Sequence, residues 1–248
     1  MAEVYGAGEM SVDGDAVSVV RTAAGGMGVA LKPGANAGSE RFVISFVTTG
    51  EGGLNLRTTE GERLRYGAAA GPGQVVIGGG VTEALIYSDD AQSLTIDVTD
   101  ITACGESREG MCFSHADLRD LIFPDGVPED PRERLLALLQ WTSVNADYAL
   151  GEEVEAEGYA LASRLTATQM FSTVYREDRG GGYCGAHSVF FAKLLQDFGF
   201  DAMTVNFGLL QNDLTHVTVL VFNPFGENRF YVLDPTFNAH FVRGRDGR

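Results

Sequence analysis

Residues 179–198 read RGGGYCGAHSVFFAKLLQDF, and this stretch decides how the second half of the chain is expected to fold. Three glycines lead into Tyr183 and Cys184. From there the apolar side chains recur at the spacing of one face of an α-helix, up to Phe198. Gly199 follows at the position of a C-terminal cap. The pattern predicts a helix that begins at or just after Cys184, so that the thiol lies at the helix N-terminus.

Two further helices are predicted upstream of this stretch. The segment 123–131, FPDGVPEDP, is rich in Pro, Asp and Gly and is typical of a linker. Asp130 can cap the helix that follows, with Pro131 at its first position and Glu133 in the place of a capping-box carboxylate. Another helix is expected over about residues 159–175.

The residues downstream predict a β-hairpin. A strand is expected from Asp201, and HVTVLVF at 216–222 is a continuous apolar strand. The turn NPFGEN then leads into RFYVLD at 229–234. Folding the chain about residue 225 places His216 opposite position 234 or 235, close to Asp234. A slip of one residue would direct the two side chains to opposite faces.

The first half of the chain is expected to be β structure. Short β-branched or alternating runs begin at residues 16, 41, 74, 83 and 93, with Gly-rich or acidic turns between them. Such spacing predicts a sandwich or a barrel. We therefore expect two domains: a β-rich domain over residues 1–122, which would bind a substrate or partner, and an α+β domain over residues 130–248.

Cys184, His216 and Asp234 are the candidate catalytic residues. A thiol attacks as the thiolate, which the free N–H groups of a helix N-terminus stabilise. A neighbouring imidazole takes the thiol proton and later protonates the leaving group. A carboxylate on the other ring nitrogen fixes the tautomer of the ring. The backbone N–H of Cys184 is a candidate donor to an oxyanion.

These residues resemble the transglutaminase-like superfamily. The matching blocks are GGYCGAHSVFFAKLLQDFGFDA, DLTHVTVLVF and FYVLDPTF, which contain Cys184, His216 and Asp234 in the family's order. The resemblance covers about residues 130–241. It implies a papain-like α+β catalytic domain and acyl transfer from a peptide or amide carbonyl through a thioester on the cysteine.

The resemblance also leaves parts of the site open. It implies a protein or peptide substrate, and hydrolysis is favoured over cross-linking because nothing in the sequence marks a second site for an amine. Gln169 and Tyr175 are the candidates for a side chain that supports the oxyanion. Nothing marks the calcium sites of animal transglutaminases, and we expect neither a cofactor nor a metal.

Two alternatives are weighed against this hypothesis. RGGGYC at 179–184 also resembles the Arg-Gly-Gly-x-Cys of arylamine N-acetyltransferases, but those enzymes have a helical N-terminal domain. The second alternative is a binding module that keeps the fold without turnover, although such a module has no need of all three site residues.

The other histidines are weaker candidates for the base. His187 lies one helical turn after Cys184 and is expected to point along the helix rather than across a cleft. His240 follows Asp234 closely, and His115 is expected to be exposed.

Charge and cysteine content limit the partners. The net charge is −16, so nucleic acid and anionic membrane surfaces should repel the chain. No apolar run approaches the roughly 20 residues of a membrane span. The start, MAEVYGAGEM, shows no signal peptide, which fits a cytoplasmic protein; a chain trimmed of its signal peptide would look the same and be exported. A disulfide between Cys104 and Cys112 would suit export, and two free thiols would suit the cytosol.

Overall fold

A computed structural model describes residues 1–33, 40–66, 70–104, 113–146, 165–175, 184–208 and 215–241. The chain divides into two compact units. The first comprises Met1–His115 and Arg164–Thr166, and the second comprises Ala116–Ser163 and Ala167–Arg248.

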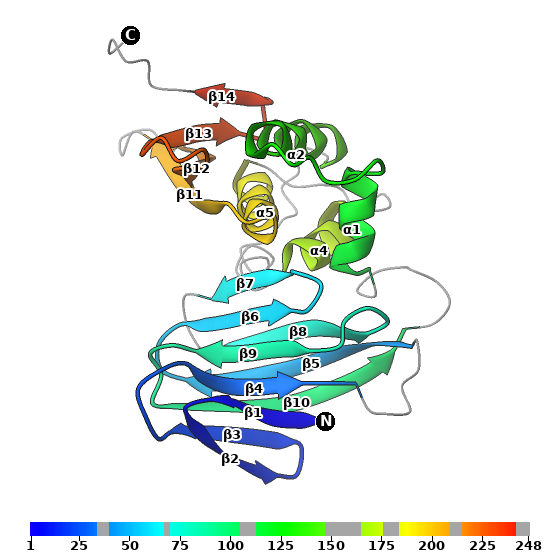
Figure 1. Cartoon of the computed structure of the whole chain (residues 1–248), viewed down its shortest axis with the longest axis vertical. Helices are drawn as coiled ribbons and strands as arrows, with labels where there is room; N and C mark the ends of the chain where they lie inside the picture. The colour runs from blue at the N-terminus through cyan, green and yellow to red at the C-terminus, as the bar shows by residue number, and fades with distance from the viewer. Residues whose placement is uncertain are drawn as a thin grey trace. The chain divides into compact units, whose positions relative to one another are not determined.

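The first unit is built from two antiparallel sheets (Figure 1). One has the strand order β1-β4-β9-β6-β7 and the other the order β2-β3-β10-β5-β8. The strands are β1 (Ala2–Gly6), β2 (Gly8–Asp13), β3 (Ala16–Arg21), β4 (Met27–Leu31), β5 (Arg41–Gly50), β6 (Leu54–Thr58), β7 (Arg63–Tyr66), β8 (Gly71–Gly78), β9 (Ala84–Ser88) and β10 (Ser93–Ala103).

The two sheets enclose one hydrophobic core. In β3 and β6, buried and more exposed side chains alternate, which is the period-2 pattern of a sheet with one buried face. Fully buried members from the first sheet include Met27 and Ile86, and members from the second include Phe46, Leu94 and Ile96. The first unit is therefore a two-layer β-sandwich.

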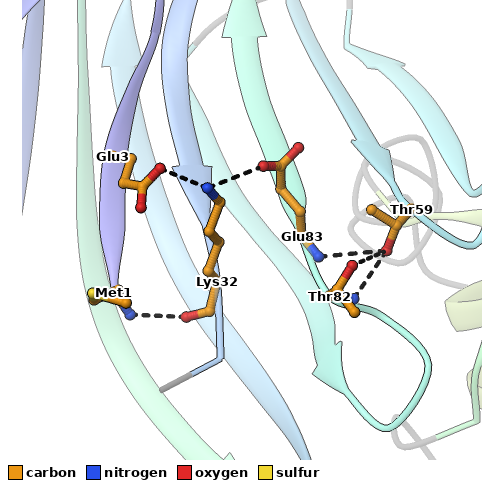
Figure 2. Close-up of polar contacts among 6 residues, drawn as sticks. All are labelled: Met1, Glu3, Lys32, Thr59, Thr82 and Glu83. Carbon is orange, nitrogen blue, oxygen red and sulfur yellow. Dashed lines mark hydrogen bonds and ion pairs between the residues drawn. The ribbon is translucent and has the colours of Figure 1, made fainter. Parts of the chain in front are cut away.

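Lys32 joins three strands at one edge of the sandwich (Figure 2). Its ammonium contacts Glu3 of β1 at 2.5 Å and Glu83, next to β9, at 3.5 Å. The hydrogen bond to Glu3 raises the pKa of Lys32. Beside it, the hydroxyl of Thr59 accepts a 2.9 Å hydrogen bond from the backbone N–H of Thr82. The contact to Glu3 links the end of β4 to β1, its neighbour in the sheet.

The second unit contains a four-stranded antiparallel sheet with helices packed on it (Figure 1). The sheet order is β11-β12-β13-β14, and helix α5 contacts both β11 and β12. The elements are α1 (His115–Ile122), α2 (Pro131–Asn145), α4 (Ala167–Met170), the π-helix η2 (Phe171–Tyr175), α5 (Cys184–Asp197), β11 (Asp201–Gly208), β12 (Thr215–Phe222), β13 (Phe230–Asp234) and β14 (Ala239–Phe241).

The ends of α2 and α5 follow the predicted capping. Asp130 precedes α2 and accepts a 2.9 Å hydrogen bond from the N–H of Arg132. Gly199 ends α5 with a φ of +86°, and Phe200 donates its N–H to the carbonyl of Leu195 at 2.9 Å. That pattern is a Schellman motif. The prediction that the helix begins at Cys184 is confirmed, so the thiol lies in its first turn.

Aromatic side chains fill the core between the helices. Phe171 of η2 contacts Trp141 of α2 at 5.3 Å and Phe190 of α5 at 6.2 Å between ring centroids. Phe190 and Phe191 are fully buried. The same helix therefore carries both the cysteine and the largest side chains of the core.

The expected fold class, α+β with a papain-like catalytic domain, is wrong. Strands make up 47% of the described residues and helices 24%, and all three sheets are antiparallel. The strands of residues 1–103 outweigh the helices because they are numerous and pack into two full layers. Positions 159–164 of the helix expected over residues 159–175 lie outside the described part of the chain; α4 and η2 occupy its last nine positions.

None of the described helices is both long and apolar enough to cross a membrane. This agrees with the absence of a long apolar run in the sequence.

Candidate active site

The hairpin of β12 and β13 brings His216 and Asp234 together. Atom Nε2 of His216 lies 2.6 Å from Oδ2 of Asp234. The ladder pairs Val219 with Leu233, and its extension places Thr218 opposite Asp234. His216 is two residues further along β12, which keeps it on the same face as the carboxylate. A diagonal neighbour of this kind is within reach of a long side chain.

The predicted register was wrong by one or two residues. Folding about residue 225 placed His216 opposite 234 or 235, whereas the observed ladder would place it opposite Thr236. The turn is longer than expected because Asn223 and Asn228 adopt φ values of +42° and +53° and Asn228 donates its N–H to the Asn223 side chain. Asparagine tolerates this left-handed conformation better than most residues.

The carboxylate of Asp234 is fixed through both oxygens. Oδ1 accepts a 3.0 Å hydrogen bond from the backbone N–H of Thr236, and Oδ2 faces His216. The Asp234 side chain is 6% exposed and the His216 side chain 34%. A carboxylate accepts hydrogen bonds, so this contact suits the tautomer of His216 that has its proton on Nε2. This leaves Nδ1 of the neutral ring as an acceptor, which is the nitrogen a base needs.

Cys184 is a free, partly exposed thiol in the first turn of α5. The first N–H groups of a helix have no partners within the helix and favour a negative charge nearby. Among the described residues, no hydrogen bond joins the Cys184 thiol to the His216 ring. The thiol therefore lies at the N-terminus of α5, and its approach to His216 stays a prediction.

Ser188 links the helix of the cysteine to the strand of the histidine. Its hydroxyl donates a 2.7 Å hydrogen bond to the carbonyl oxygen of Val217, the residue after His216. Ser188 lies one turn after Cys184 on the same helical face, about 6 Å along the axis. The bond anchors the start of β12 to the first two turns of α5. This role was not predicted. The signal that the sequence carries is that Ser188 is a polar residue on a largely apolar helix.

A second anchor holds the segment that follows Asp234. Ser143 of α2 donates a 2.6 Å hydrogen bond to the carbonyl oxygen of Pro235. Together with Thr236, this fixes the turn that carries the carboxylate. Neither anchor was predicted, because each joins residues far apart in the chain.

The rival histidines occupy different positions. His187 is buried and packs against the ring of Tyr175 at 5.4 Å between centroids. His240 lies opposite Leu233 on β14, on the face opposite to His216. The expectation that His115 is exposed is wrong, because its side chain is buried at 5% exposure.

Tyr175 and Gln169 are both buried in the helices beside α5. Gln169 belongs to α4 and is 2% exposed. The Tyr175 ring contacts Phe190 at 5.2 Å, and its hydroxyl has no hydrogen-bond partner among the residues that the structure describes. Burial raises the pKa of the Tyr175 hydroxyl above its usual value. The hydroxyl is therefore a neutral donor without a recorded acceptor, and its oxyanion role stays a prediction.

The described residues contain no group of three or more His, Cys, Asp or Glu side chains that could hold a metal ion. Cys104 is disulfide-bonded. Cys112, its expected partner, lies outside the described residues.

Comparisons with known proteins give no family. No protein-family model and no curated protein matches the sequence. A solved structure described as "CBM4 structure and function" is 10% identical over 41% of this chain and 84% of that chain, with a TM-score of 0.27. A mannanase from Podospora anserina, described as "GH26-CBM35 beta-(1,4)- mannanase", is 12% identical over 65% of this chain and 39% of its own, with a TM-score of 0.22. At these TM-scores neither structure carries an argument about fold or function, and neither supports the transglutaminase-like resemblance.

Proposed function

We propose that this chain is a cysteine-dependent acyl-transfer enzyme of transglutaminase-like type. Cys184 is the nucleophile, His216 the base and Asp234 the residue that orients the histidine. The observation that carries the proposal is the 2.6 Å contact between Nε2 of His216 and the buried Asp234 carboxylate, which leaves Nδ1 free to accept a proton.

The first half of the reaction forms a thioester. His216 takes the proton of the Cys184 thiol, and the sulfur attacks the carbonyl carbon of a peptide or amide. The backbone N–H of Cys184 donates to the oxyanion of the tetrahedral intermediate. When the C–N bond breaks, the imidazolium gives its proton to the leaving amine. The acyl group stays on the sulfur.

The second half returns the free enzyme. His216 takes a proton from water, which attacks the thioester and releases a carboxylic acid, and the sulfur leaves as the thiolate. An amine in place of water would give transfer. Hydrolysis is the favoured outcome because nothing in the sequence marks a second site for an amine.

The substrate class follows from the chemistry and the charge. A protein or peptide amide supplies the carbonyl, and the −16 net charge disfavours nucleic acid as a partner. The β-sandwich of the first unit would present this substrate or a partner protein. The chemistry needs neither a cofactor nor a metal ion.

Alkylation of Cys184 tests the proposal. The whole chain is treated with iodoacetamide at mildly acidic pH, and the carboxamidomethylated peptide is quantified by mass spectrometry. Cys184 should react far faster than glutathione at the same pH, and His216→Ala should slow it at least about 100-fold. His240→Ala is the matched control, because that histidine lies on the other face of the sheet. A rate equal to that of glutathione, unchanged in His216→Ala, would support the binding module instead.

Two substrates then separate the enzymatic alternatives. Release of a carboxylic acid from a peptide amide, lost in Cys184→Ala, supports hydrolysis. Incorporation of a fluorescent alkylamine into a protein supports transfer. Binding of acetyl-coenzyme A in calorimetry would favour the acetyltransferase alternative, and its absence removes it.

A further inference from the structure

Two aromatic side chains neighbour His216 from the two strands that flank β12. The ring of Phe237, just after β13, lies 5.4 Å from the imidazole between centroids, with 40° between the planes. Phe207 of β11 is paired directly with His216 in the β11–β12 ladder. Both rings face solvent, with exposures of 71% and 50%. A molecule that reaches the histidine therefore meets aromatic surface on both sides of its strand.

Exposure alone is weak evidence, because single apolar side chains are common on protein surfaces. The position of Phe237 is fixed, however. The Asp234 carboxylate that binds His216 also accepts the N–H of Thr236, and Asn238 closes the turn with a φ of +50°. The Asp234 carboxylate thus positions both the His216 ring and the backbone turn that carries Phe237. The relation between the two rings is built into the hairpin.

The described positions on the His216 face of the sheet carry few charges. Positions on its face of the sheet follow from the ladder registers of β11 to β14. Among the described residues at those positions, Asp201 at the far end of β11 is the only charged side chain besides His216 and Asp234. An apolar group next to the reacting carbonyl would find the two rings of Phe207 and Phe237.

We infer that Phe207 and Phe237 select acyl donors in which a bulky apolar group neighbours the reacting carbonyl. This inference rests on the proposed acyl transfer at Cys184. Each ring offers a face against which an aromatic or branched aliphatic group can pack, and removal of apolar surface from water supplies the selectivity.

A pair of alkylating probes tests the selectivity apart from the reactivity. 2-Chloroacetamide and N-benzyl-2-chloroacetamide react by the same step: the sulfur forms a C–S bond and chloride leaves. The ratio of their rate constants at Cys184 is divided by the ratio measured with glutathione. We expect this normalised ratio to favour the benzyl probe by about three- to tenfold. In Phe237→Ala it should fall toward one, and in Phe237→Leu it should be partly retained.

Phe222→Ala is the matched control. Phe222 is also an exposed phenylalanine on β12 and on the same face, but it lies six residues, about 20 Å, from His216. This variant should keep the benzyl preference. All three substitutions are at exposed positions, and thermal unfolding checks that each variant is folded.

The outcomes separate this inference from the proposed function. A normalised ratio of one in the wild-type chain, with fast and His216-dependent alkylation, would overturn the selectivity and leave the proposed function standing. An equal fall for both probes in Phe237→Ala would assign the ring to shielding the His216–Asp234 bond and also overturn the selectivity. Slow alkylation that does not depend on His216 would overturn the proposed function itself.

Discussion

The hydroxyl of Ser188 donates a 2.7 Å hydrogen bond to the carbonyl oxygen of Val217, and this bond joins the helix that begins at Cys184 to the strand that begins beside His216. Ser188 itself is fully buried. The relative position of the proposed nucleophile and the proposed base thus depends on a residue to which the proposal gives no chemical step.

Ser188→Ala should lower both stability and reactivity. The lost bond leaves the carbonyl of half-buried Val217 with one partner fewer, so the free energy of unfolding should fall by about 1–3 kcal/mol. Cys184 alkylation should slow because the start of β12 is no longer anchored. Urea unfolding and iodoacetamide rates measure the two effects. Ser143→Ala, which removes the hydrogen bond to Pro235, serves as the comparison variant. Ser188→Thr keeps a hydroxyl and should retain part of the stability and part of the alkylation rate. Unchanged alkylation in Ser188→Ala would show that the anchor does not position the site.

Asp234→Asn should lower turnover by about 10²- to 10⁴-fold. An amide in place of the carboxylate presents a donor or a weaker acceptor to Nε2, so the ring loses the partner that keeps its proton there. Hydrolysis of a peptide amide gives the rate, and the ¹⁵N spectrum of the imidazole gives the tautomer. Asp201→Asn, on the same face but far from the site, should leave both unchanged. Full activity with the wild-type tautomer would refute the orienting role.

Lys193→Met should stabilise the fold most at neutral pH and below. Burial lowers the pKa of Lys193 to about 7, and the Asp197 carboxylate opposes part of that shift. The unfolded chain keeps the ordinary value of 10.5, so between the two values it binds more protons than the folded chain. The cost of the buried charge is therefore complete below about pH 7 and disappears as the pH rises toward 10.5.

The measurement for this variant is the difference in unfolding free energy between Lys193→Met and wild type. We expect a gain of about 1–4 kcal/mol at pH 7 that shrinks by pH 10. Lys32→Met is the exposed control, where the change should stay within about 1 kcal/mol. A gain at Lys193 that does not vary with pH would contradict the burial argument.

Gly199→Ala should destabilise the chain by about 1–2 kcal/mol. The residue holds a φ of +86° at the end of α5, and a Cβ there meets no atom within 4 Å, so the cost is conformational rather than steric. Gly199→Asn should cost less because asparagine tolerates this conformation. Thermal unfolding of the wild type, Gly199→Ala and Gly199→Asn gives the order of their stabilities. Equal stabilities for the two variants would argue against a left-handed cap at residue 199.

Local patterns allowed prediction of the helices near the site. The cap at Asp130, the start of α5 at Cys184 and the cap at Gly199 depend on neighbouring residues, and all three were predicted. The fold class was not. Strand β4, MGVAL, contains Gly28, which lies against Tyr87 of β9 in a space that no side chain would fit. The strand β4 forms because neighbouring strands pair with it, and the local sequence does not reveal that pairing.

The site could be predicted in part, because some of its geometry also depends on residues close together in the chain. Proximity of His216 and Asp234 follows from one hairpin, although its register was predicted one or two residues away. Ser188 and Ser143 contact backbone 29 and 92 residues further on, which no local pattern reveals. The catalytic roles of Cys184, His216 and Asp234 stay predictions until a reaction is measured.

The last described strand, β14, covers the edge of β13 at Asp234, so its loss would affect the proposed site. β14 is the outer strand of its sheet, and its residue Ala239 pairs with Asp234. A protease that cut between Asp234 and Ala239 would separate β14 from the sheet. β13 would then be the outer strand, and the backbone beside Asp234 would face solvent instead of β14. Such a cut should therefore abolish the proposed acyl transfer, even where the rest of the sheet stays folded.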